Sequence, residues 1–115
     1  METSDIRDLV HFAPDEPARH DLFETDHLWS EVVCLQETQR FGPVGDSNSD
    51  AIVVVLAGEV AAQVGKGRAR IRQWGCAVVP AGDELTLANA SGEPAVVLMI
   101  AAPPPRPGIA ITPDG

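Results

Sequence analysis

The chain has 115 residues, enough for one domain with a buried core. Its net charge of −9 argues against a nucleic-acid partner, because proteins that bind phosphate backbones need a basic face. No apolar run is long enough to span a bilayer, and the first residues lack the basic and apolar parts of a signal peptide. We therefore expect a cytoplasmic protein with neither a nucleic-acid nor a membrane partner.

Residues 1–27 are acidic and are interrupted by Pro14 and Pro17. We predict an apolar clip around residues 8–12 and a short helical or irregular turn around residues 18–26. Proline disrupts both helices and central strands, so no long regular element is expected here. The segment is predicted to be an N-terminal arm that packs on the rest of the domain or across a dimer.

Residues 28–102 have the pattern of an all-β domain. Short apolar or alternating runs are rich in β-branched residues, and the gaps between them are rich in Gly, Pro, Asn, Asp and Ser. No run shows sustained apolar recurrence at helical spacing. Many short strands at this density predict a sandwich or a barrel.

One predicted strand carries a compact basic feature. Arg68, Arg70 and Arg72 alternate with Ala69 and Ile71, so the three arginines lie on one side of the sheet. They form either a solvated outer face or a patch for an anionic ligand. Both interpretations remain open at this point.

The cysteines and tryptophans are few. Cys34 and Cys76 lie in apolar runs without the spacing of a zinc or redox motif, so we predict buried, reduced thiols. Trp29 opens a predicted strand and Trp74 lies in a turn. Both are predicted to fill the core or a contact between subunits, in preference to stacking on a ligand.

Residues 103–115 are rich in proline and are predicted to form an extended tail with little packing of its own. No internal repeat and no second domain are evident.

The run from Gly42 to Gly92 resembles the cupins, a superfamily of double-stranded β-helix (jelly-roll) barrels. The apolar strand and glycine of "AIVVVLAGEV" match the first cupin motif, and counting back from Gly58 places Ala51 at the position of its glutamate. With the commoner spacing, Val44 and Asp46 take the two histidine positions. The second motif keeps its proline, glycine and asparagine, but has leucine at its histidine: Pro80, Gly82, Asn89 and Leu85. Gly75 is one residue closer to the proline than the pattern requires.

The resemblance covers roughly residues 28–102 and implies a metal-free barrel. Cupin metals are held by imidazoles and a carboxylate, and Val44, Ala51 and Leu85 cannot donate a lone pair. Asp46 alone could. A single carboxylate does not hold iron, manganese or zinc, so we predict no metal and no other cofactor.

The replaced positions predict an apolar lining inside the barrel. Strand alternation turns one set of side chains inward, and these are the candidate ligand-pocket residues: Ala51, Val53, Val55, Leu85 and Leu87. The interior is either packed solid or holds a dry pocket for a small apolar or amphipathic molecule.

Some cupins catalyse reactions with side-chain acids and bases alone. This chain has no tyrosine, and its three histidines all precede the predicted barrel. His27 and Asp46 are the weak catalytic candidates. The other carboxylates considered are Glu31, Asp50, Glu59, Asp83 and Glu84, of which the turn aspartates more often bond to nearby backbone.

We therefore expect a small-molecule binding or sensing module, with its ligand unidentified. The first alternative is a metal-independent lyase, cyclase or isomerase, and a metal-dependent dioxygenase is a weaker one. A homodimer is expected, through packed barrel faces or through the N-terminal arm.

Overall fold

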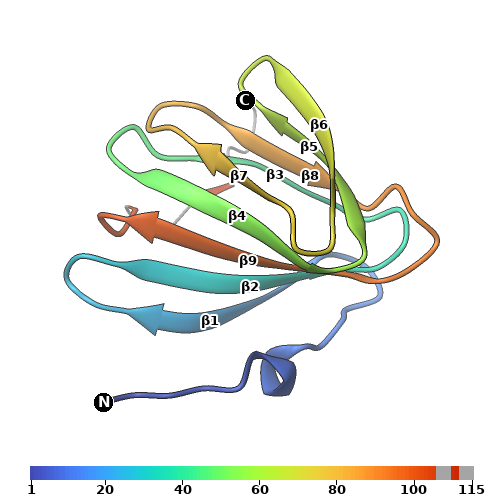
Figure 1. Cartoon of the computed structure of the whole chain (residues 1–115), viewed down its shortest axis with the longest axis horizontal. Helices are drawn as coiled ribbons and strands as arrows, with labels where there is room; N and C mark the ends of the chain where they lie inside the picture. The colour runs from blue at the N-terminus through green and yellow to red at the C-terminus, as the bar shows by residue number, and fades with distance from the viewer. Residues whose placement is uncertain (106–109, 112–115) are drawn as a thin grey trace.

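The structure, a computed structural model of the chain, describes residues 1–105 and 110–111. Two antiparallel five-stranded sheets face each other across one core (Figure 1). Sheet A has the order β1 (Ala18–Glu24), β2 (Trp29–Leu35), β9 (Ala95–Ala102), β4 (Asp50–Ala57) and β7 (Cys76–Val79). Sheet B has the order β10 (Ala110–Ile111), β3 (Arg40–Gly45), β8 (Leu85–Ala88), β5 (Glu59–Val64) and β6 (Gly67–Arg72). The predicted all-β jelly roll is confirmed.

Strand alternation decides which side chains enter the core. On β4, Val53 and Val55 are fully buried, whereas Ile52 between two inward positions is 46% exposed. Full burial of such a side chain stabilises the fold by about 1.5–3 kcal/mol. The five side chains predicted to face inward are all buried in the main core: Ala51, Val53, Val55, Leu85 and Leu87.

The N-terminal segment covers part of the outer face of sheet A. A 3₁₀ helix, Ile6–Leu9, begins after Asp5, whose side chain accepts a hydrogen bond from the Arg7 N–H (3.0 Å). The guanidinium of Arg7 lowers the pKa of Asp5 to about 2. Apolar side chains of this segment pack against outward residues of β2 and β9, with Ile6, Leu9, Val10 and Phe12 against Val32, Cys34 and Val96.

Residues 18–24 differ from the sequence prediction. The expected helical or irregular turn is strand β1, which pairs antiparallel with β2, so that Ala18 lies opposite Cys34 and Asp21 opposite Glu31. The register shifts between Asp21 and Glu24. Backbone pairing with β2 supplies the hydrogen bonds that the local sequence did not suggest. The first strand of sheet A therefore lies within the predicted arm.

Glycines at two of the turns have left-handed backbone. Gly58, at the corner between β4 and β5, has φ +77°, and a Cβ there would meet the Pro94 carbonyl oxygen at 2.6 Å. Gly82, in the turn before β8, has φ +90°, and its N–H donates to the Asp46 carbonyl oxygen (3.0 Å). Left-handed backbone of this kind is unfavourable for residues with a side chain.

Asn89 is a buried polar residue that joins two loops. Its side-chain amide donates to the carbonyl oxygens of Leu35 (3.0 Å) and Glu93 (2.7 Å). Its side-chain oxygen accepts from the N–H and the hydroxyl of Ser91. Every hydrogen-bonding group of the amide therefore has a partner, as a buried polar side chain requires.

The predicted tail, residues 103–115, lies mostly outside the described residues. Within the described part, β10 pairs with β3 opposite Val44 and Gly45, and the Ser49 hydroxyl donates to the Pro103 carbonyl oxygen (2.6 Å). No helix within residues 1–105 and 110–111 has the length and apolarity to cross a membrane.

Candidate functional site

The four positions that match cupin metal ligands come together in the structure. Val44, Asp46, Ala51 and Leu85 line one small cavity at one end of the barrel, although they belong to three different stretches of chain. Val44 and Leu85 are cross-strand partners on β3 and β8, and Ala51 lies across the barrel on β4. The strand register therefore brings these residues to one cavity.

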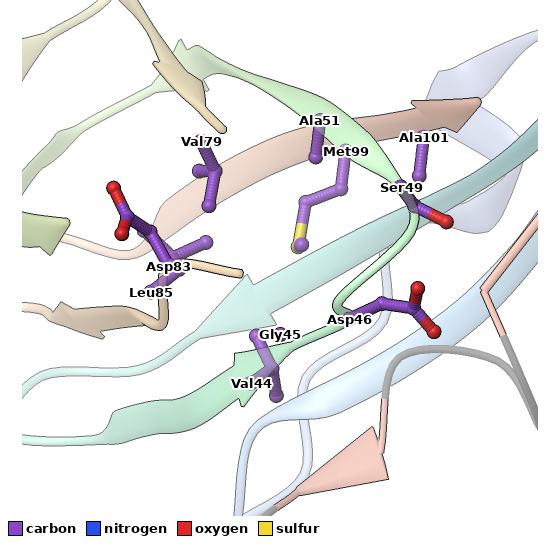
Figure 2. Close-up of a pocket in the computed structure, with 10 residues that line it drawn as sticks. All are labelled: Val44, Gly45, Asp46, Ser49, Ala51, Val79, Asp83, Leu85, Met99 and Ala101. Atoms are coloured by element: carbon purple, nitrogen blue, oxygen red, sulfur yellow. The ribbon is translucent and has the colours of Figure 1, made fainter. Parts of the chain in front are cut away.

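Hydrocarbon closes this cavity. Figure 2 shows the Met99 side chain reaching from β9 into the space between Ala51, Val79 and Leu85. The open volume for a water-sized sphere is about 10 Å³. That is close to the minimum for a single water molecule, so this cavity has no room for a substrate without rearrangement.

Carboxylates stand only at the margin of the cavity. The Asp46 side chain accepts a hydrogen bond from the Asn48 N–H (2.7 Å), and Figure 2 shows its carboxylate directed away from Met99. Asp83 is exposed. Asp50 opens strand β4 and accepts from the Ala81 N–H (2.9 Å), so its bond is to the turn before β8 and not to its own neighbours in sequence. Within the described ranges, no group of three or more His, Cys, Asp and Glu side chains could hold a metal ion.

The predicted pocket residues divide into two groups. Ala51 and Leu85 line the cavity, whereas Val53, Val55 and Leu87 lie deeper in the closely packed core. Because that core is filled, the five residues do not enclose a common ligand-sized space.

The catalytic candidates are not brought together. His27 is exposed in the turn between β1 and β2, where its N–H donates to the Thr25 hydroxyl (3.2 Å). It does not line the cavity that contains Asp46. Glu59 accepts from Arg70 (2.8 Å) and lies 3.4 Å from Arg72, so it is half-buried in an ion-pair cluster.

A partly buried ion pair joins the inward face of β2 to the edge strand β1. Glu31 is 4% exposed on the inward face of β2, and both of its oxygens accept from the Arg19 guanidinium (2.8 and 3.1 Å). The guanidinium also lies over the Phe41 ring, 5.2 Å from its centroid. Burial raises the pKa of Glu31, although Arg19 and His20 act to lower it and Asp21 acts to raise it.

The sequence identified Glu31 as a carboxylate near the barrel but did not identify its partner. Arg19 lies in the segment that was expected to be irregular. Without a predicted strand there, the alternation of inward and outward side chains could not be used to place Arg19. One signal was available, because Glu31 is the single charged residue in the apolar run of β2. A charge in such a position requires a partner.

The two cysteines and two tryptophans have different environments. Trp29 is buried as predicted, but Trp74 is 74% exposed at a turn with φ +74°. Cys34 is buried, and burial raises its pKa, whereas Cys76 is exposed on the edge strand β7. The prediction of burial was therefore wrong for Cys76, because an edge strand without an outer cover leaves its outward side chains in solvent.

No family model and no curated protein matches the sequence. Among solved structures, TT1209 from Thermus thermophilus aligns with a TM-score of 0.85 at 29% identity, covering 91% of this chain and all of that one. A double-stranded β-helix protein from Klebsiella pneumoniae aligns with a TM-score of 0.83 at 19% identity, covering 90% of both chains.

An RmlC-like cupin from Desulfovibrio desulfuricans aligns with a TM-score of 0.78 at 20% identity. The alignment covers 90% of this chain and 98% of that one. Together with the sheet topology, these likenesses confirm the resemblance found in the sequence. The chain has the double-stranded β-helix fold of the cupins.

Proposed function

We propose that this chain is a metal-free cupin that acts as a binding module and has no catalysis of its own. One observation carries the proposal. At the end of the barrel where the motif positions converge, Val44, Ala51, Leu85 and Met99 close the space to about 10 Å³. A metal needs several donor side chains at one point, and a substrate needs volume. A metal-dependent dioxygenase is disfavoured on the same grounds.

The closed interior directs binding to the outer surface. The small apolar ligand predicted from the sequence would need the space that Leu85 and Met99 occupy. We therefore propose that the physiological contacts of this barrel are made by the outward faces of its two sheets.

Elemental analysis and a cavity variant test this proposal together. Purified protein equilibrated with iron, manganese, nickel or zinc and then washed should retain well below one metal per chain. Wild-type protein should bind no benzene, whereas Met99→Ala should bind it, because a dry cavity lined by apolar side chains takes apolar guests. Stoichiometric metal, or benzene binding by the wild type, would contradict the proposal.

The acid–base alternative has one observation in its favour, the Glu31–Arg19 pair between the inward face of β2 and the edge strand β1. A metal-independent lyase, cyclase or isomerase needs a polar group in the barrel interior, and the pKa of Glu31 is raised by burial. Both oxygens of Glu31 are already held by Arg19, however, and the Glu31 side chain is only 5% exposed. These contacts favour a structural ion pair over an acid that reaches a substrate.

We also propose that the chain forms a homodimer through an apolar face of sheet A. This face consists of outward side chains of β4, β7 and β9: Ile52, Val54, Val78 and Ile100. Val78 is 62% exposed and Ile52 is 46% exposed. Apolar surface gathered in this way is typical of protein contacts.

A second copy is the partner that suits this face. Two chains of charge −9 repel each other, so a stable contact between them needs a face with few carboxylates, and the side chains above are uncharged. Asp50, at the start of β4 on the same side, already accepts a hydrogen bond from the Ala81 N–H. A two-fold axis that brings this face against its own copy makes the contact self-complementary.

A further inference from the structure

The outer face of sheet B carries a groove bordered by arginines. Arg40 is on β3, and Arg68 and Arg70 are on β6. Strands β8 and β5 lie between β3 and β6 in the sheet. Small or uncharged side chains form the floor: Ala61, Gln63, Thr86 and Ala88. The groove has an open volume of about 500 Å³. We call it the arginine groove.

The strand register explains why the groove is open. Arg40 lies opposite Ala88, Ala88 opposite Ala61, and Ala61 opposite Arg70. One row across the sheet therefore has an arginine at each end and two alanines between. Three strand spacings separate the ends of the row, roughly 14 Å. Methyl groups cannot fill that distance, so the space between the guanidinium groups remains free.

The charges of the groove are only partly balanced. Arg70 shares Glu59 with Arg72, at 2.8 and 3.4 Å. Arg40 and Arg68 have no carboxylate within ion-pair distance among residues 1–105. The face therefore concentrates positive charge on a chain whose net charge is −9. Such a local field attracts anions to this face and not to the rest of the surface.

We propose that the arginine groove binds a small molecule carrying two or more phosphate or carboxylate groups. Guanidinium groups bind both kinds of oxyanion with paired hydrogen bonds. Arginines on opposite borders require at least two anionic groups in one ligand, and the alanine floor admits the body of the molecule between them. This inference rests on the proposed function, since it specifies the ligand of an outer surface.

Calorimetric titration with two probes tests the inference. Tripolyphosphate supplies phosphate groups and citrate supplies carboxylates, and the titrations are performed at low salt on protein passed over a chelating resin. Arg68→Gln should weaken binding about tenfold, as expected for the loss of a hydrogen bond between charged groups. Arg40→Gln should have a similar effect. Arg7→Gln removes the same charge from an exposed residue that does not line the groove, and it should change the affinity by less than about twofold.

The outcomes separate the possible explanations. Binding of one probe that both groove variants weaken supports the inference and identifies the class of anion. The inference fails if wild-type protein binds neither probe, or if Arg40→Gln and Arg68→Gln bind as tightly as Arg7→Gln. The titration is repeated on protein that has not passed over the resin. Binding that appears only in this untreated protein, and that neither groove substitution weakens, would indicate a bound metal and would overturn the proposed function as well. Both arginines are exposed, so circular dichroism should be unchanged in either variant.

Discussion

Val44 on β3 and Leu85 on β8 are directly opposed cross-strand partners, and both are 1% exposed. The sequence resemblance to the cupin motifs assigns these two positions to metal-binding histidines. Here they form a hydrocarbon contact that helps to close one end of the barrel, with Met99 against them. The same strand geometry that would bring ligands to a metal here brings apolar side chains together in a packed core.

Leu85→Ala is therefore expected to act as a core truncation. The loss in free energy of unfolding should be about 2–5 kcal/mol, because the surroundings of a deleted core side chain relax only partly. Urea denaturation measures this loss. Leu28→Ala is the matched control, since Leu28 is 38% exposed and should lose much less. A loss below about 1.5 kcal/mol at Leu85 would mean that the interior is open or wet.

Four substitutions at the convergent positions should create a metal site: Val44→His, Asp46→His, Ala51→Glu and Leu85→His. Each introduced polar group is costly to bury without a partner, on the order of 1–3 kcal/mol. The combined variant should be much less stable than the wild type and should regain stability when nickel or zinc is added. Thermal unfolding with and without metal measures the effect, and wild-type protein should show no such shift. Absence of rescue by any divalent ion would show that the four positions do not converge as described.

Val78→Asp should dissociate the proposed dimer. A carboxylate within the apolar face would be buried without a partner in the contact, while Val78 is exposed enough in the single chain for the fold to tolerate the change. Light scattering after size-exclusion chromatography should give the mass of two chains for the wild type and of one for the variant. Gly92→Asp adds the same charge in an open turn and should remain dimeric. A monomeric wild type would refute the dimer.

Glu31→Gln should reveal the raised pKa of Glu31. A carboxyl whose pKa is higher in the folded than in the unfolded chain keeps its proton longer when folded. Its contribution to stability is then present at low pH and is lost as the pH rises through the folded-state pKa. The free energy of unfolding of the wild type, relative to Glu31→Gln, should therefore fall as the pH rises above about 4, the ordinary pKa of a glutamate. A relative stability that rises with pH would show that Arg19 outweighs burial.

Thiol titration should distinguish the two cysteines. In the Val78→Asp variant, Cys76 should react quickly with a disulfide reagent under native conditions, because it is exposed on β7. Cys34 should react only after unfolding, since it is buried and burial raises its pKa. In wild-type protein, Cys76 should react more slowly, as β7 would lie within the dimer contact. Equal reaction rates for Cys76 in both proteins would show that β7 lies outside the dimer contact.

Much of the fold was predictable because the apolar pattern of most strands is local. The run at β4 is a continuous stretch of apolar, mostly β-branched residues, and Gly58 and Gly82 mark the turns beside it and before β8. Strand β1 was not predictable in the same way. Arg19 and Asp21 take positions where apolar residues usually appear, and the strand exists because β2 offers it a backbone partner. That pairing is a tertiary interaction, which the local sequence does not indicate.

The site was predictable in position but not in volume. Motif spacing was enough to bring Val44, Ala51 and Leu85 to one point. Whether that point is open depends on Met99, which comes from β9 and belongs to neither motif. Arg40 is a similar case, because it joins Arg68 and Arg70 only through the order of four strands. Contacts of this kind depend on strand order, which periodicity does not specify.

Asn89 separates two roles that a single motif combines. Its hydrogen bonds to Leu35, Glu93 and Ser91 tie the loops at one end of the barrel, and none of them involves the cavity. A barrel can therefore keep this asparagine, with the turn at Gly82, for architecture alone. A sequence search based on such residues would group chains that share the fold, whether or not they are enzymes. The residues at Val44, Ala51 and Leu85 are the ones by which such chains should be sorted.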